Sequence, residues 1–309
     1  MKLNTFSRTF AFLALCSCGE SESQNISPDN PVVIPTEITE SYTDRQDRGV
    51  LENSDINEAS GLVVSVLNPN ALWTHNDSGD DARVFLIGDS GQNLGVFYLE
   101  NLTNRDWEDM ALIQDPIKGT NYLYIAEIGD NNALHKSILV YRFPEPNVSA
   151  WNGQFHQDTI PEEDIEKFTL VYPDGARDAE TLLLDVSGDM YVISKRDNPV
   201  GIYRANYPQS TSTNNELQKV GDIDLTFVVA GDAVLGDILL KTYDRVYLWR
   251  KTTENNTLEN IFNHISPLRL PYTTEPQGES IAWQPDRGGY FTLSEAAGQQ
   301  VHLYYYKKK

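Results

Sequence analysis

Beyond residue 18 this chain contains no cysteine. Both cysteines, Cys16 and Cys18, lie near the start of the 309-residue sequence, so a disulfide is excluded in the part that folds. No apolar run of about 18 residues follows the N-terminus, which excludes a multi-pass membrane protein. Basic residues are few, because 24 Lys and Arg stand against 45 Asp and Glu, for a formal charge of −21. A chain this acidic repels phosphate backbones, so we expect no nucleic-acid binding.

The usual signatures of catalysis are missing as well. The sequence has no Gly-x-Ser-x-Gly elbow, no phosphate-binding Gly-x-x-x-x-Gly-Lys loop and no His-Glu-x-x-His helix. Only five histidines occur. Hydrophobic residues make up 40% of the chain, which is enough for a packed core. The composition therefore predicts a folded acidic domain whose activity no standard motif identifies.

The N-terminus is typical of an export signal. Lys2 and Arg8 supply positive charge, and a short apolar run follows them from Phe10 to Leu15. Leu15-Cys-Ser-Cys18 then resembles a bacterial lipobox, in which the small Ser17 precedes the cysteine that receives lipid. We therefore predict a lipoprotein signal peptide over residues 1–17 and lipidation at Cys18; an ordinary secretory signal is the alternative.

After Cys18 the sequence becomes polar and rich in Pro, Asn and Ser. We interpret residues 18–44 as a flexible tether and residues 45–309 as one folded domain. Two or more acyl chains hold a protein firmly on a bilayer, whereas one chain binds marginally. These features predict a lipid-anchored protein of the bacterial cell envelope, at the periplasmic or surface face of the outer membrane.

The sequence of the domain predicts strands and turns, and it contains an internal repeat. Short runs of Val, Ile, Leu, Tyr and Phe are bounded by Gly, Asp, Asn or Pro. One motif recurs five times, and each copy is followed by two apolar strands. The copies begin at Ser60, Glu108, Glu180, Asp232 and Glu279.

The repeat intervals are 48, 72, 52 and 47 residues. A four-stranded propeller blade takes about 40–50 residues, so we predict an all-β, five-bladed β-propeller. The long interval indicates an insertion around Asn147 to Asp164. The last repeat lacks an outer strand, which a segment near Arg48 to Glu52 can supply to close the ring. Six blades, with one weak repeat hidden, and a β-sandwich are the alternatives.

In a propeller, the start of the first strand and the end of the second strand of every blade meet at one mouth of the channel. First-strand starts carry Glu58 with Ser60, Asp106 with Glu108, Asp178 with Glu180, Asp232, and Gln277 with Glu279. Second-strand ends carry His75, Asn76 and Asp77; Glu127 and Asp130; Lys195 and Arg196; Lys241 and Arg245; and Glu295.

Carboxylates set close together need a raised pKa or a bound cation. Hard oxygen ligands suit Ca²⁺, so Ca²⁺ is the one cofactor that we expect. Its candidate ligands are Glu58, Glu108, Glu180, Asp232 and Glu279. Three residues are candidates for catalysis: Glu108 and Glu180 as base or metal ligand, and His75 as acid or base. The candidate ligand-binding residues are Asp77, Glu127, Lys195, Arg196, Lys241, Arg245 and Glu295.

A structural interpretation competes with this one. Acidic residues at strand starts can hold adjacent blades together through backbone N–H groups. The run Asn76-Asp-Ser-Gly-Asp80 also suits a tight turn.

These motifs resemble known propellers. Glu279-Ser-Ile-Ala resembles the first-strand signature of phytase-like propellers. The wider set looks like an uncharacterised family of bacterial secreted propellers, over Glu58 to the C-terminus: Glu58-Ala-Ser-Gly-Leu, His75-Asn-Asp-Ser-Gly, Asp106-Trp-Glu-Asp-Met-Ala, Ile128-Gly-Asp-Asn, Asp178-Ala-Glu-Thr-Leu and Gln277-Gly-Glu-Ser-Ile-Ala. The phytase likeness implies a calcium site at a carboxylate-rich mouth and cleavage of phosphate monoesters, although the longer acidic signature of phytase first strands is absent.

Three functions follow as hypotheses. The first is an anchored propeller whose acidic mouth binds a small molecule, a glycan or a protein partner, with Ca²⁺. The second is a metal-assisted hydrolase of phosphate or carboxylic esters. The third is a structural scaffold of the envelope. A calcium-dependent change in melting temperature would separate the first two from the third.

Overall fold

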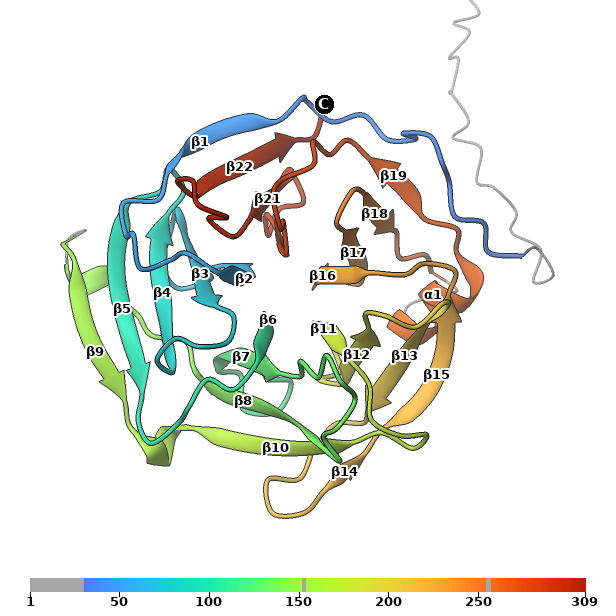
Figure 1. Cartoon of the computed structure of the whole chain (residues 1–309), viewed down its shortest axis with the longest axis horizontal. Coiled ribbons are helices and arrows are strands. Elements are labelled where there is room, and N and C mark those ends of the chain that lie inside the picture. Colours follow the sequence, from blue (N-terminus) through green and yellow to red (C-terminus); the bar gives the residue numbers. More distant parts are fainter. Residues whose placement is uncertain (1–30, 152–153, 254–256) are drawn as a thin grey trace, which may run out of the picture. The chain divides into compact units, whose positions relative to one another are not determined.

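The structure, a computed structural model, describes residues 31–151, 154–253 and 257–309. The predicted signal peptide and Cys18 lie outside the described residues. Pro31–Lys309 form one compact unit, in which five sheets are arranged in a ring around a central axis (Figure 1), and we use the word channel for the region along this axis. This arrangement confirms the five-bladed β-propeller and leaves no place for a sixth blade or a sandwich.

The strands of the first three blades are named from the channel outwards. Blade one contains β2 (Ala59–Val64), β3 (Ala71–Asn76), β4 (Arg83–Gly88), β5 (Asn93–Leu99) and β9 (His156–Ile160). Blade two contains β6 (Trp107–Gln114), β7 (Asn121–Glu127), β8 (Ile138–Pro144), β10 (Glu166–Val171) and β14 (Asn215–Glu216). Blade three contains β11 (Ala179–Leu184), β12 (Met190–Ser194), β13 (Val200–Ala205) and β15 (Gln218–Ile223).

The last two blades complete the ring, in the same outward order. Blade four contains β16 (Val228–Val234), β17 (Asp237–Thr242), β18 (Val246–Trp249) and β19 (Leu268–Leu270). Blade five contains β20 (Ser280–Trp283), β21 (Gly289–Leu293), β22 (His302–Lys307) and β1 (Gln46–Val50). The described helical segments are short: α1 (Leu258–His264) and two 3₁₀ turns, Ser149–Trp151 and Glu162–Asp164. None of the described helices is long and apolar enough to cross a membrane.

Two features of the repeat are confirmed. The outer strand of blade five is β1, which pairs antiparallel with β22 and so joins the two ends of the ring. It lies at Gln46–Val50, slightly before the expected segment. The predicted insertion holds β9, which adds to the outer edge of blade one by pairing parallel with β5. Closing the ring satisfies sheet edges that would otherwise pair with other chains.

Large aromatic side chains fill the spaces between blades. Trp73 of blade one and Trp107 of blade two share one buried cluster, while Trp249 and Trp283 lie in two others. All four are fully buried. Truncating such a side chain costs about 3–5 kcal/mol, so the position of each blade against its neighbour is firmly fixed.

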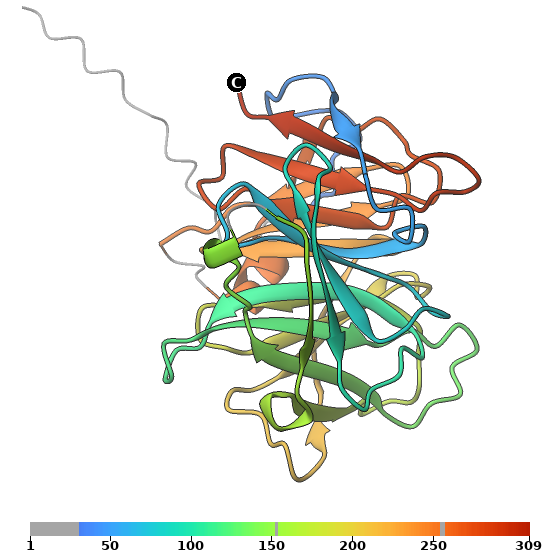
Figure 2. The ribbon, with the colours of Figure 1, turned by 90° about the vertical axis from the view of Figure 1, so that its left-hand side faces the viewer.

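Seen from the side, the ring has two ends, and the strands connect them (Figure 2). The inner strands β2, β6, β11, β16 and β20 begin at one end, which we call the acidic end, and finish at the other, which we call the apolar end. Because each strand is antiparallel to the next within the first four of a blade, second strands end at the acidic end. This geometry places the sequence-predicted residues.

The first described residues pack against the propeller. Residues 33–43 fall in the predicted tether, yet the Val33 N–H donates to Ser266 Oγ over 2.9 Å and the Thr39 N–H donates to the Arg269 carbonyl over 2.9 Å. Tyr42, which is buried, forms an isolated antiparallel β-bridge with Lys308, next to the end of β22.

Candidate functional site

The inner strands share a local irregularity at the acidic end. In four of them the pairing register with the second strand shifts next to the first residue. One residue is then left without a partner in β6, β11 and β16, and two residues, Ser60 and Gly61, are left without one in β2. In β6 this residue is Glu108 and in β11 it is Glu180. A β-bulge turns its extra side chain away from the regular pleat, and bulges are common beside active sites. The bulge accounts for carboxylates at the channel mouth.

Blade four departs from the sequence alignment of repeats. Its bulge falls after Val228, so Val229 occupies the position of Glu108 and Glu180, three residues before Asp232. Asp232 instead lines a cavity at the apolar end, and its Oδ2 accepts a hydrogen bond from the Trp283 N–H over 2.7 Å. Asp232 therefore does not join the other predicted metal ligands. It joins blades four and five, as the structural interpretation expected for acids of this kind.

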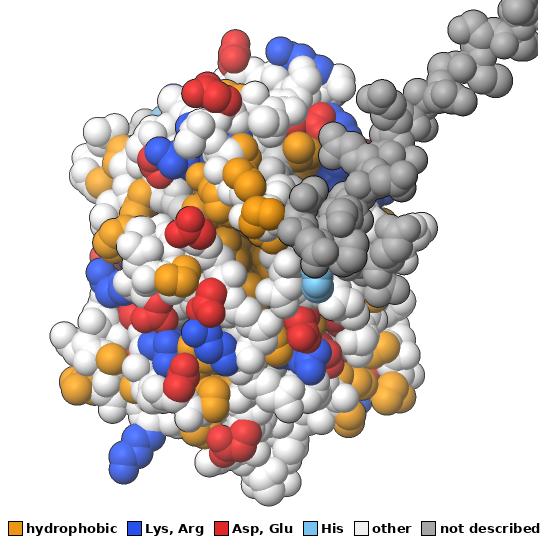
Figure 3. All heavy atoms as spheres, turned by 90° about the vertical axis from the view of Figure 1, so that its right-hand side faces the viewer, with side chains coloured by type: hydrophobic (Ala, Val, Ile, Leu, Met, Phe, Trp, Pro, Cys, Tyr) orange, Lys and Arg blue, Asp and Glu red, His pale blue; other side chains and the backbone are white. Residues whose placement is uncertain are grey.

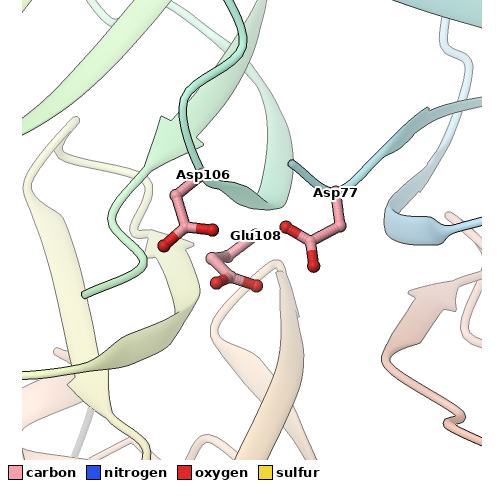
Figure 4. A group of neighbouring side chains, drawn as sticks. All are labelled: Asp77, Asp106 and Glu108. Carbon is pink, nitrogen blue, oxygen red and sulfur yellow. The ribbon is translucent and has the colours of Figure 1, made fainter. Parts of the chain in front are cut away.

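Three carboxylates converge at the acidic end. Asp77 follows β3 of blade one, while Asp106 and Glu108 lie at the start of β6 in blade two. One oxygen from each lies within 4.8 Å of the others, and the side chains point toward one another (Figure 4). We call these three residues the acidic cluster.

The electrostatics of the acidic cluster are unfavourable without a counter-ion. Burial, and then the charges of Asp106, Glu279 and Glu58, raise the pKa of Asp77 to about 6. Burial, followed by Asp77 and Asp106, raises the pKa of Glu108 well above its ordinary value. The pKa of Asp106 is also raised, first by burial. No hydrogen bond or ion pair from a lysine or arginine reaches these carboxylates among the contacts of the described residues.

A lysine lies beside the acidic cluster. Lys195 follows β12 and is buried; it forms an ion pair with Glu180 of its own blade, and its Nζ is 3.7 Å from Glu279 of blade five. The Tyr243 hydroxyl donates to Glu279 Oε1 over 2.5 Å. The second oxygen of Glu180 is buried without a hydrogen-bond partner. We call Glu180, Lys195 and Glu279 the lysine bridge.

Two further residues bound the mouth. Glu295 accepts a hydrogen bond from the Gln277 amide over 2.8 Å, and burial together with Glu279 raises its pKa to about 7. Gly129 follows β7, and a Cβ there would lie 2.3 Å from Glu108 Oε1 and 2.4 Å from Asp106 Oδ2. A side chain at this position would therefore displace the carboxylates of the acidic cluster.

Other predicted residues do not belong to the acidic cluster. His75 is fully buried: its Nδ1 lies 2.9 Å from the Asn76 carbonyl, and burial lowers its pKa to about 4. No part of its side chain is exposed to a ligand at the mouth. Glu127 forms an ion pair with Arg105 over 3.6 Å, and burial raises its pKa. Glu58 is exposed and lines a shallow pocket outside the acidic cluster.

The remaining cations do not face the acidic cluster. Arg196 donates to Asp178 over 2.6 Å. Lys241 is buried, donates to the Gly278 carbonyl, and has its pKa lowered to about 8 by burial. Arg245 forms an ion pair with Asp244 over 3.2 Å. Of the predicted cationic residues, Lys195 pairs with Glu180 and Glu279 at the channel mouth, and Arg196 pairs with Asp178.

The acidic cluster has the dimensions of a cation site. Calcium takes oxygen ligands at about 2.3–2.6 Å, so two ligands on one ion are separated by at most about twice that distance. The 4.8 Å limit that encloses the three oxygens meets this condition. A Ca²⁺ ion there would hold all three carboxylates ionised. The residues present fit the expected cofactor, though with a ligand set different from the predicted one.

Sequence reasoning missed part of the site. It placed Asp106 at a strand start without assigning it a role, and it overlooked Tyr243 because only the charged residues of Lys241-Thr-Tyr-Asp-Arg245 were considered. The signal for Asp106 was its spacing of two from Glu108, which puts both side chains on one side of a strand. For Tyr243, the signal was its place at a second-strand end.

Comparisons with known proteins give only distant likenesses to solved structures. No protein-family model matches the chain, and no curated protein matches its sequence. Among solved structures, the chain is similar to the PQQ-bound form of an aldose sugar dehydrogenase from Streptomyces coelicolor, with 9% identity and a TM-score of 0.45 over 88% of this chain and 100% of that one. It is also similar to a protein assigned as a gluconolactonase (11%, TM-score 0.46, 89% and 94%) and to a luciferin-regenerating enzyme (12%, TM-score 0.41, 81% and 77%). At these TM-scores the likenesses carry no argument about the site.

Proposed function

We propose that the protein binds a divalent cation, Ca²⁺, in the acidic cluster and uses it to hold a small anionic or oxygen-rich ligand at the mouth of the propeller. The observation that carries this proposal is the convergence of Asp77, Asp106 and Glu108 within 4.8 Å, with no hydrogen bond or ion pair to them from a lysine or arginine among the contacts of the described residues. Carboxylates so close together repel one another by several kcal/mol unless they are protonated or share a cation.

The surroundings support a bound ligand rather than a closed structural ion. Asp77 and Asp106 are half-buried, so the acidic cluster is open on one side. The lysine bridge lies next to it: burial raises the pKa of Glu108, and the charge of the Lys195 ammonium partly opposes this rise. A carboxylate or phosphate drawn to a cation in the acidic cluster would also be attracted by this ammonium. A ligand anion would then be held between two positive charges.

Calcium binding is tested by calorimetry on the chelated protein. We expect binding with release of protons at pH 6, because Asp77 and Glu108 must lose protons to bind the ion. Glu108→Gln should abolish binding, whereas Glu127→Gln, a buried carboxylate paired elsewhere, should retain it. Equal binding by both variants would refute the assignment of the ion to the acidic cluster.

A second function is favoured by Glu295. A carboxyl group with a pKa near 7 at the channel mouth suits a general base at neutral pH. In hydrolysis of a phosphate or carboxylic ester, a water molecule would give a proton to Glu295, and the oxygen of this water would form a bond to phosphorus or to the acyl carbon. The alcohol would leave with the proton returned by Glu295. A bound cation would stabilise the negative charge that develops.

The two functions are separated by Glu295→Gln. Binding alone predicts no turnover of p-nitrophenyl phosphate or p-nitrophenyl acetate by either form. Hydrolysis predicts turnover by the natural protein and its loss in Glu295→Gln, with calcium affinity changed little. Turnover that persists in Glu295→Gln would exclude this residue as the base.

We further propose that lipid on Cys18 anchors the protein to a membrane of the bacterial envelope. The lipobox-like sequence Leu15-Cys-Ser-Cys18 supports this proposal. Mass spectrometry of the membrane fraction should find diacylglycerol on Cys18, and Cys18→Ser should release the protein from that fraction.

A further inference from the structure

The apolar end of the propeller carries a cavity that the acidic mouth does not use. The cavity has a volume of about 540 Å³ and is lined near the finish of the inner strands by one residue or more from each blade. These residues include Val63, Leu112, Leu184, Val234 and Trp283. Asp232 is the one acid among the lining residues.

Exposed apolar side chains surround this cavity. The turn that follows the inner strand exposes Val66 in blade one, Ile117 in blade two, Val186 in blade three and Leu235 in blade four. We call these four residues the apolar rim. In blade five the corresponding turn carries Asp286 and Arg287 instead, so the rim covers four blades. Scattered apolar residues are ordinary, but four at one end around an apolar cavity indicate an interaction surface.

Three carboxylates of this end are turned inwards. Glu145 accepts from the Val66 N–H over 3.0 Å, and Asp115 accepts from the Ile117 N–H over 2.9 Å; both carboxylates are buried. Asp185 is likewise buried and accepts from the Ser187 N–H over 2.8 Å. In a chain with a formal charge of −21, these three acids hold backbone N–H groups of the turns, whereas Asp286 of blade five is exposed.

The charges that remain near the rim are partly basic. Lys118 is adjacent to Ile117, Arg287 lies in the turn of blade five, and the side chain of Lys251 approaches the Leu235-Gly236 turn. By contrast, the side of the ring seen in Figure 3 carries acidic and basic side chains interspersed with apolar ones. Apolar side chains flanked by Lys and Arg are the composition of surfaces that enter the headgroup region of a bilayer.

The described chain begins at this same end. Strand β19 begins at the apolar end, because β16 finishes there and each following strand of blade four runs antiparallel to the last. Ser266, which binds the Val33 N–H, lies two residues before β19. Cys18, the predicted site of lipidation, is 13 residues before Pro31. An extended chain reaches about 3.3–3.6 Å per residue, so this segment spans at most about 45 Å.

We propose that the apolar end docks on a lipid bilayer, with the apolar rim in the headgroup region and the acidic mouth facing away from the membrane. The observations that carry the proposal are the rim, the inward-turned carboxylates and the start of the described chain at this end. The anchor then holds the propeller against the membrane in one orientation, with the channel axis perpendicular to the plane of the membrane. A ligand for the acidic end would arrive from the aqueous side.

The test separates the rim from the lipid anchor. The chain from residue 18 onward, carrying Cys18→Ser, is mixed with phosphatidylcholine vesicles and sedimented. We expect weak binding that Ile117→Ser reduces by roughly tenfold, the effect of keeping one large apolar side chain in water. Leu134→Ser is the matched control, because Leu134 is 75% exposed against 76% for Ile117 and lies in the β7–β8 loop at the acidic end. Both variants should melt at the natural temperature, since both side chains are in solvent.

Three results would overturn the proposal. The first is absence of sedimentation with vesicles, and the second is an equal loss in both variants. The third is self-association, seen by light scattering without vesicles, that Ile117→Ser abolishes; this result would assign the rim to a second copy of the chain. Because none of these measurements uses calcium, a failed membrane test leaves the acidic cluster untouched.

Discussion

Replacing Asp77 by Asn should stabilise the calcium-free protein. Burial and neighbouring acids raise the pKa of this carboxyl from 3.8 to about 6 in the folded state. A raised carboxyl pKa penalises the folded state once the pH exceeds the unfolded value, and the penalty is complete above the folded value. At pH 7.5 the difference corresponds to about 3 kcal/mol, and at pH 4.5 to about 1 kcal/mol.

The substitution removes this penalty without removing a hydrogen bond. Asp77 Oδ1 accepts from the Ser78 N–H, and the amide oxygen of Asn can do the same. For a domain of this size, about 1 kcal/mol changes the melting temperature by about 2–4 °C. In chelator at pH 7.5, we therefore expect Asp77→Asn to melt up to about 10 °C above the natural protein, and this gain to shrink at pH 4.5.

Calcium should stabilise the natural protein but not Asp77→Asn. Ligand at a hundredfold excess over its Kd stabilises the natural protein by about 2.7 kcal/mol, a gain that Asp77→Asn should lose. Scanning calorimetry with chelator and then with excess Ca²⁺ measures both quantities. The control is Asp81→Asn, an exposed acid four residues along the same loop, which should behave as the natural protein does. If Asp77→Asn is less stable in chelator, or still responds fully to calcium, the reasoning fails.

Three more substitutions test the remaining assignments. Lys195→Met should lower the free energy of unfolding by about 3–5 kcal/mol in urea at pH 7.5, because it leaves the buried Glu180 and Glu279 without their cation; unchanged stability would contradict the lysine bridge. Gly129→Ala changes no charge but displaces the carboxylates of the acidic cluster, so calorimetry should show calcium affinity at least about tenfold weaker, and full affinity would show that the cluster tolerates a Cβ. Burial raises the pKa of Asp232 to about 7, so Asp232→Asn should raise the melting temperature at pH 8 and leave the calcium response intact; loss of that response would restore Asp232 as a ligand.

The repeat made the fold predictable, whereas the site was predictable only in part. A motif that returns every 47 to 52 residues in three of four intervals fixes blade size and number, and the missing last strand required closure by the N-terminal segment. Glu108 and Glu180 were found because their repeats align in sequence and in structure. Asp232 was misplaced because the residues of blade four that resemble the repeated motif begin three positions after the bulge. The spacing of residues along the sequence does not show where a bulge lies.

The sequence by itself determined the elements and their order: alternating apolar strands, turn residues and a periodic motif follow from local propensity and spacing. Only the tertiary structure decided which charges meet. Asp77 and Glu108 are 31 positions apart and on different blades, and Lys195 contacts an acid 84 positions away. A contact of this kind depends on the angle between blades and on the direction of one bulged side chain, neither of which local sequence sets. The same holds for the apolar rim, whose residues are ordinary singly and become a surface because a closed ring brings four turns to one end.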